Sequence, residues 1–157
     1  MASKQVDAHR AAHENWERRE FDALVADMVE DFSYEDHSRG LSIGSRDEFV
    51  DYVSAWAESF PDGTITEGAA YHDAGDTSVA EFILEGTNDG PFGPFPATGR
   101  HVSVPICEIM NFDSEGQMVS GGIYYDQMWM LVQLGHAEPP EGQLLSRGKF
   151  PVSRRSL

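Results

Sequence analysis

A single carboxylate, Asp126, closes the otherwise apolar and aromatic segment that begins at Gly121. If Asp126 faces the same side as Gly122 and Tyr124, it points into the interior of the fold. A carboxylate in an apolar cavity is desolvated, which raises its pKa toward the range useful for a general base. Asp is also a favourable N-cap for the helix expected to follow it. Both roles stay open for Asp126, and they are compatible with each other.

Other polar and aromatic residues could line the same interior. His37 closes a short alternating segment, although a hydrogen bond within a turn, to Asp36 or to the backbone, is the favoured interpretation. Asn88 either faces inward or belongs to the turn that follows it, and the two interpretations are equally good. Trp56 and Trp129 lie at helical spacings that are more typical of core residues, although cavity walls use the same residue types.

The motifs of several other chemistries are missing. The chain has no glycine-rich phosphate loop and no Gly-x-Ser-x-Gly segment. Cys107 is its single cysteine, which excludes an internal disulfide and a cysteine pair for zinc and favours a reducing compartment. His9 and His13 have helical i, i+4 spacing, but without an acid at a suitable spacing we expect exposed helix residues rather than ligands. We therefore expect no metal and no cofactor.

The charge balance argues against polyanionic partners. The chain has 27 Asp and Glu against 11 Lys and Arg, a net charge of −16. Nucleic acid and anionic membrane surfaces would be repelled. No stretch of 18 consecutive apolar residues predicts a membrane span, and the N-terminal residues lack the apolar core of a secretory signal. We expect a cytoplasmic protein that binds a small hydrophobic molecule.

The first part of the chain has helical periodicity. Residues 5–29 follow a 3.6-residue period, with a break near residue 20, and Phe32 to His37 alternate as a short strand before a loop over 38–44. Ser45 and Glu48 form a capping box for a helix that ends at Phe60, before Pro61.

From residue 64 the period changes to two. The expected strands cover residues 64–73, 77–88, 99–112 and 117–125, and a helix over 126–134 closes the domain with Gly135 in C-cap position. Phe82 and Leu84 share the inward face. Helices followed by long antiparallel strands predict an α+β fold, with a curved sheet around a ligand cavity. We assign residues 1–135 to one domain and 136–157 to an extended or partner-crossing tail.

Several short motifs occur in a specific order. They are Leu84-Glu85-Gly86-Thr87, Gly90-Pro91-Phe92, Pro96 to Arg100, Ile109 to Phe112, Tyr125-Asp126 and Gln133-Leu134-Gly135. With these motifs, residues 5–135 resemble the SnoaL-like polyketide cyclases, within the wider group of NTF2-like, cone-shaped α+β barrels. The resemblance implies that Asp126 is the catalytic acid and base. It would take a proton between two carbonyls, and the enolate would close a ring by aldol addition without metal or cofactor.

Two positions depart from the family pattern. Asn88 stands where the family often has histidine, and it can hydrogen-bond an enolate oxygen but cannot shuttle protons near neutral pH. Gly122 stands where the family often has tryptophan, and it would deepen the cavity for a flat, multi-ring or branched substrate. We expect His37, Trp56, Asn88, Gly122, Tyr124 and Trp129 to bind the substrate, and Phe92 and Phe95 to border the cavity mouth.

Two other functions compete with the cyclase or isomerase interpretation. An epoxide-hydrolase-like enzyme would need carboxylates with an arginine, for which Arg100 and Glu108 are candidates. A non-catalytic small-molecule-binding protein would be favoured if Asp126 were exposed and only capped a helix. In either case Val79, Ile83 and Ile109 would make the outer sheet face apolar, so we expect a homodimer packed sheet to sheet, burying about 1,500 Å² in total.

Overall fold

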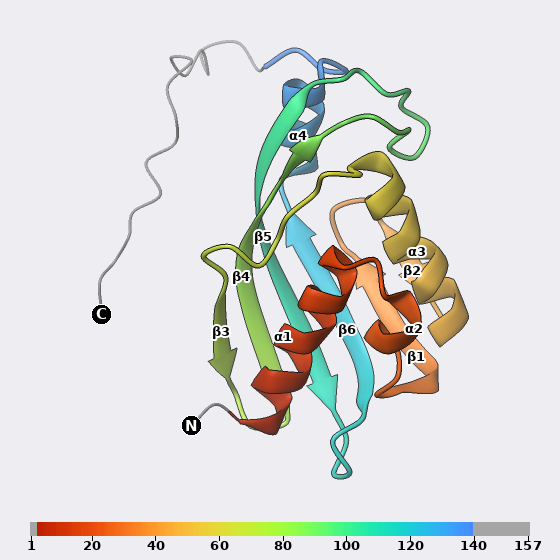
Figure 1. Ribbon diagram of the computed structural model, residues 1–157, viewed down its shortest axis with the longest axis vertical. Helices are drawn as coiled ribbons and strands as arrows, with labels where there is room; N and C mark the ends of the chain where they lie inside the picture. Colours follow the sequence, from red (N-terminus) through yellow and green to blue (C-terminus); the bar gives the residue numbers. More distant parts are fainter. Residues whose placement is uncertain (1–2, 140–157) are drawn as a thin grey trace.

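A curved six-stranded sheet forms the body of the chain, with α1, α2 and α3 on its inner side and α4 at one end (Figure 1). The computed structural model describes residues 3–139. The helices are α1 (Lys4–Glu17), α2 (Phe21–Leu24), α3 (Arg46–Ser59) and α4 (Gln127–Leu134). The strands are β1 (Met28–Asp36), β2 (Leu41–Ile43), β3 (Ala70–Asp73), β4 (Thr77–Thr87), β5 (His101–Phe112) and β6 (Met118–Tyr125).

The sheet is mixed and open. Its strand order is β2-β1-β6-β5-β4-β3, so that β2 and β3 form two free edges and the sheet does not close into a barrel. All neighbouring strands are antiparallel except β1 and β6, which run parallel. The predicted α+β class and the curved sheet around N-terminal helices are confirmed, and the long strands β4, β5 and β6 are antiparallel as expected, whereas β1 runs parallel to β6.

The N-terminal helix is shorter than the sequence predicts. Ser3 caps α1 by accepting a hydrogen bond from the Val6 amide, and the helix ends at Glu17. Arg19 then adopts a left-handed conformation with φ of 61°, which breaks the helix near residue 20 as expected. The strand β1 begins at Met28, within the range expected to be helical, because residues 28–36 pair with β6.

The helix α3 begins and ends where its sequence predicts. The Ser45 hydroxyl accepts from the Glu48 amide, while the Glu48 carboxylate accepts from the Gly44 amide. The helix ends at Ser59 with Phe60 as its C-cap. Its apolar face, including Phe49 and Trp56, is buried under the sheet.

The inward face of the long strands agrees with the period-two pattern. Phe82 and Leu84 are buried, as predicted. The expected strand over residues 64–73 is reduced to β3, with one isolated bridge at Thr64. Its first residues leave the sheet because the Glu17 carboxylate accepts hydrogen bonds from the amides of Ile65 and Thr66, which replaces the ladder there.

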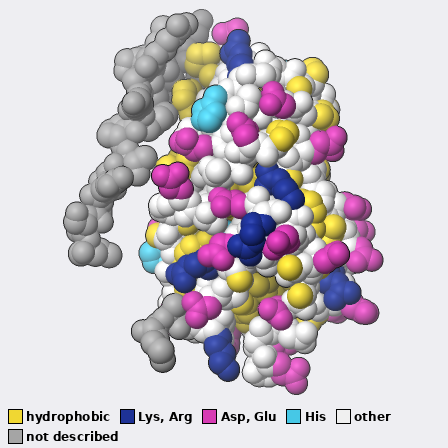
Figure 2. All heavy atoms as spheres, in the orientation of Figure 1, with side chains coloured by type: hydrophobic (Ala, Val, Ile, Leu, Met, Phe, Trp, Pro, Cys, Tyr) yellow, Lys and Arg dark blue, Asp and Glu magenta, His cyan; other side chains and the backbone are white. Residues whose placement is uncertain are grey.

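The visible surface is rich in acidic side chains, with fewer Lys and Arg between them (Figure 2). Over residues 3–139, no helix combines the length and the apolar character that crossing a bilayer requires. The predicted tail falls, from residue 140 on, outside the described residues.

Candidate active site

A cavity of about 70 Å³ lies between the inner face of the sheet and the helices α1 and α3. Its walls are almost entirely apolar, from residues such as Leu24, Phe49, Leu84 and Ile123. The polar side chains that line it are His13, Tyr34, Tyr52 and Glu108, together with the indoles of Trp16 and Trp56. An apolar pocket with a few convergent polar groups is the usual form of a small-molecule site.

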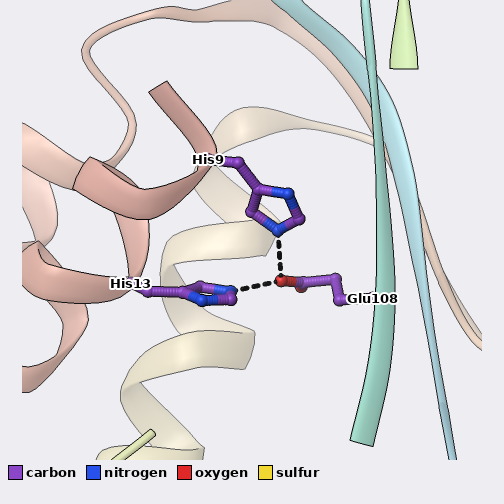
Figure 3. A group of neighbouring side chains, drawn as sticks. All are labelled: His9, His13 and Glu108. Atoms are coloured by element: carbon purple, nitrogen blue, oxygen red, sulfur yellow. Dashed lines mark hydrogen bonds and ion pairs between the residues drawn. The ribbon is translucent and has the colours of Figure 1, made fainter. Parts of the chain in front are cut away.

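The Glu108 carboxylate on β5 is the centre of a buried hydrogen-bond network. His9 and His13 lie one turn apart on α1 and both point at this carboxylate (Figure 3). The Nε2 atoms of His9 and His13 lie 3.0 and 2.6 Å from Glu108 Oε2. The Tyr34 hydroxyl donates to the other oxygen, Oε1. The carboxylate is thus held from three sides at the wall of the cavity.

The network lowers the pKa of Glu108. Burial alone would raise the pKa of Glu108, but the hydrogen bonds from His13 and His9 outweigh burial and hold that pKa well below its usual range. Burial lowers the pKa of His9, which favours the neutral imidazole there. Burial and the neighbouring Glu108 raise the pKa of Tyr34 well above its usual value, so Tyr34 stays a hydrogen-bond donor.

Each histidine is also held from behind. His9 Nδ1 lies 3.0 Å from the Ser78 hydroxyl, and His13 Nδ1 lies 2.8 Å from the Tyr71 hydroxyl. The ligand atoms of His9, His13 and Glu108 lie within 4.8 Å of one another, so these three side chains could hold a metal ion. In this structure the same atoms satisfy one another by hydrogen bonds.

This network is the part of the site that the sequence did not reveal. The expectation that His9 and His13 are exposed is wrong, since they are 0% and 6% exposed. Their acid comes from a strand 95 residues beyond His13, a separation that no local spacing indicates. One signal was present: Glu108 shares the inward face of its strand with Ile106 and Met110, where an acid needs a partner.

A second buried carboxylate, Asp36, stands behind the cavity wall. It is fully buried and accepts hydrogen bonds from the hydroxyls of Tyr52, at 2.9 Å, and Tyr125, at 3.2 Å. The Arg39 amide donates to its other oxygen at 2.9 Å. Of these residues, Tyr52 lines the cavity.

Asp126 lies outside the cavity lining. It is exposed, and its carboxylate accepts a hydrogen bond from the Trp129 amide at 2.8 Å, which makes it the N-cap of α4. The capping role is therefore present in the structure. The expected apolar surroundings of Asp126 are absent, because the side chain faces solvent.

Asp126 lies outside the cavity because the alternation of inward and outward residues along β6 is shifted by one residue from the predicted one. The inward face of β6 carries Gly121 and Ile123: a Cβ atom on Gly121 would lie 3.0 Å from the Tyr34 ring, and Ile123 lines the cavity. Gly122 and Tyr124 share one face of β6, as expected, but it is the face opposite to the cavity. A shift of one residue moves a whole set of side chains to the other side of a sheet. The prediction that Gly122 deepens the cavity is wrong for this reason.

The other expected substrate-binding residues divide into one inside the cavity and several outside it. Trp56 lines the cavity. His37 and Tyr124 stack on each other at 4.3 Å on the exposed side of the sheet. Asn88 is buried, but it bonds the backbone of its own loop, including the Gly90 carbonyl and the Thr98 amide. Trp129 is half-buried on α4 and does not line the cavity.

The predicted hydrolase pair is separated. Glu108 lines the cavity, but Arg100 is exposed and lies beside Gly135, and no arginine is among the described residues of the lining. The two loop phenylalanines expected to border the cavity mouth are absent from the cavity lining. Phe92 is buried against Trp56, with ring centroids 5.1 Å apart, and Phe95 is half-buried.

Comparisons with solved structures show the same fold. A protein from Jannaschia sp. CCS1, provisionally described as a SnoaL-like polyketide cyclase, matches with a TM-score of 0.74 and 20% identity over 87% of this chain and 94% of its own. IdmH from Streptomyces antibioticus, provisionally described as a polyketide cyclase, gives 0.71 and 20% identity over 85% and 99%. A Catenulispora acidiphila protein with a ketosteroid isomerase-like fold, in complex with trimethylamine, gives 0.68 and 20% over 83% and 94%.

The sequence comparisons identify the family. No curated protein matches the chain significantly. The profile of the SnoaL-like polyketide cyclases matches residues 6–134, which is nearly the whole described part. The chain therefore belongs to the SnoaL-like polyketide cyclase family.

Proposed function

We propose that this protein is a cofactor-independent cyclase or isomerase that removes a proton from a carbon next to a carbonyl group of a small hydrophobic substrate. The observation that carries the proposal is the buried carboxylate of Glu108, which three hydrogen-bond donors hold at the wall of an apolar cavity. Family membership supports the same reaction type.

Glu108 is the group that would take the proton. A carboxylate has about four lone-pair positions. Tyr34, His9 and His13 occupy three of them, two of which are on Oε2. The remaining position on Oε1 is available to a substrate proton, while the three donors fix the carboxylate in place.

The low pKa of Glu108 restricts the substrate class. A weakly basic carboxylate removes protons efficiently only from acidic carbons, such as one between two carbonyls or between a carbonyl and a double bond. The cavity volume of about 70 Å³ favours a reacting part no larger than a single ring. The rest of a larger substrate would extend toward the cavity mouth.

The resemblance points to a different base, Asp126. That assignment stays a prediction, which requires the substrate to reach the exposed end of β6 rather than the cavity. Asp126→Asn and Glu108→Gln are matched variants, because each replaces a carboxylate by an amide of the same shape. Asn also keeps the ability to cap α4.

The test is isomerisation of 3-cyclohexen-1-one, a one-ring β,γ-unsaturated ketone, followed by the ultraviolet absorption of its conjugated product. We expect Glu108→Gln to lower turnover by about 10²- to 10⁴-fold, the usual effect of a positioned base. Asp126→Asn should retain turnover. Circular dichroism of both variants checks that they are folded.

The reverse pattern would assign the base to Asp126 and refute the role of Glu108. If the wild-type protein neither isomerised this ketone nor catalysed the enolisation of one-ring 1,3-diketones, the proposed reaction would be refuted. The small-molecule-binding interpretation, which the exposure of Asp126 favours, would then stand.

A further inference from the structure

The indole nitrogen of Trp56 lacks a hydrogen-bond partner, which sets it apart from every other buried side-chain nitrogen and oxygen among residues 3–139. Trp56 is 7% exposed and lines the cavity. A buried donor without a partner is rare, because it has lost its hydrogen bond to water without replacement. Such a donor at a cavity wall is suited to an oxygen atom of a bound molecule.

An acceptor lies beside this donor. The Tyr52 ring packs edge-on against Trp56, with centroids 6.4 Å apart, and Tyr52 also lines the cavity. Burial and the neighbouring Asp36 raise the pKa of Tyr52 well above its usual value, so the Tyr52 hydroxyl keeps its proton. Because the Tyr52 hydroxyl donates its own proton to Asp36, its oxygen can still accept a hydrogen bond.

We propose that Trp56 and Tyr52 form a subsite for a hydroxyl group, on an enol, a phenol or an alcohol. The ligand oxygen accepts from Trp56 Nε1, and the ligand proton is donated to the Tyr52 oxygen. Tyr52 in turn donates to Asp36. The subsite rests on the proposed function in one respect, that the substrate of that reaction occupies this cavity.

Asp36 fixes the direction of the hydrogen bonds in the subsite. Its carboxylate is fixed by Tyr52, Tyr125 and the Arg39 amide, so Tyr52 is held as a donor toward Asp36 and as an acceptor toward the cavity. A ligand that can only accept uses Trp56 alone. An anionic oxygen would face the lone pairs of Tyr52. The pair therefore selects a protonated hydroxyl over an ether or an enolate.

The test uses three one-ring probes, phenol, anisole and benzene, titrated into the full chain. The chain has three tryptophans, so its ¹H–¹⁵N spectrum has three indole signals, and Trp56→Phe identifies one of them. Phenol should move the Trp56 indole proton downfield and bind about tenfold more tightly than benzene, since each net hydrogen bond is worth about 0.5–1.5 kcal/mol. Anisole should move the same signal but bind more weakly than phenol.

Two variants separate the donor from the acceptor. Tyr52→Phe should abolish the preference for phenol over anisole, and Tyr125→Phe is the matched control, because it removes a hydroxyl from Asp36 without touching the cavity lining. Equal binding of phenol and benzene by the wild-type protein, or an unmoved Trp56 signal, would overturn the subsite. Phenol selectivity without ketone turnover would refute the proposed function alone, and turnover without selectivity would refute the subsite alone.

Discussion

Removing the acceptor at the centre of the buried network should destabilise the fold, and by how much depends on what replaces Glu108. Leucine leaves His9, His13 and Tyr34 without their acceptor. Each buried donor left unsatisfied costs about 1–3 kcal/mol, and breaking one member of a buried charged pair typically costs about 3–5 kcal/mol in total. We expect Glu108→Leu to lower the free energy of unfolding by about that total.

Glutamine at the same position should cost much less. Its carbonyl oxygen can accept from both histidines, and its amide can donate to Tyr34 after the hydroxyl rotates. Hydrogen bonds to a charged acceptor are worth about 1.5–3 kcal/mol against 0.5–1.5 for neutral ones, a loss that the easier burial of an amide partly offsets. A net cost of about 1–2 kcal/mol follows for Glu108→Gln.

Urea denaturation at pH 7, followed by circular dichroism, measures both differences. In thermal unfolding each kcal/mol should appear as a shift of about 3–5 °C in Tm. If Glu108→Leu were as stable as Glu108→Gln, the hydrogen bonds from His9, His13 and Tyr34 to residue 108 would not contribute to stability. The reasoning on the network would then be refuted.

Three further predictions concern pH, strand faces and assembly. Burial lowers the pKa of His9 in the folded protein, so the unfolded chain takes up a proton on His9 at a higher pH than the folded protein does. The free energy of unfolding should therefore fall as the pH drops below about 6.5. The lowered pKa of Glu108 should cause a second loss of stability below about pH 4.5. A plot of Tm against pH should show this loss in the wild-type protein and not in Glu108→Gln. In urea denaturation, Gly121→Ala should lower the free energy of unfolding by more than about 1 kcal/mol, and Gly122→Ala should lower it by less. A Cβ atom on Gly121 would lie 2.7 Å from Met110 Sδ and 2.8 Å from the Ile109 carbonyl oxygen. A Cβ atom on Gly122 would lie 3.0 Å from the His37 ring, which can move aside. Sedimentation at micromolar concentration should show a homodimer, and a species of 17.4 kDa alone would contradict it.

Much of the fold could be predicted from the sequence because local rules decide it. Ser45 and Gly135 mark helix ends through capping and a left-handed residue, and both lie where their chemistry requires. Alternation along 77–88 gave the inward face correctly, since one face of β4 is buried along its whole length.

The candidate site was harder to predict, for two physical reasons. On β6 each face carries a glycine and a tyrosine, so alternation does not distinguish inside from outside. The expectation that Asp126 points inward is therefore wrong by one residue. At Glu108 the partners come from a helix far away in sequence. Only the packing of α1 against the sheet brings His9 and His13 to it, and no short-range pattern encodes that packing.

The parallel pairing of β1 with β6 has a consequence for how the chain folds during synthesis. β1 can pair with β2 at once, but Tyr34 also pairs with Gly121, so the other side of the first strand stays unpaired until the last strand is made. Long-range contacts of this kind slow folding, because a large loop must close before they stabilise anything. At about 5–20 residues per second, a ribosome leaves the β6 side of β1 unpaired for several seconds. During that time the edge of β1 and the apolar side of α3 are open to chaperones, and co-expression of a chaperone should raise the soluble yield of this protein.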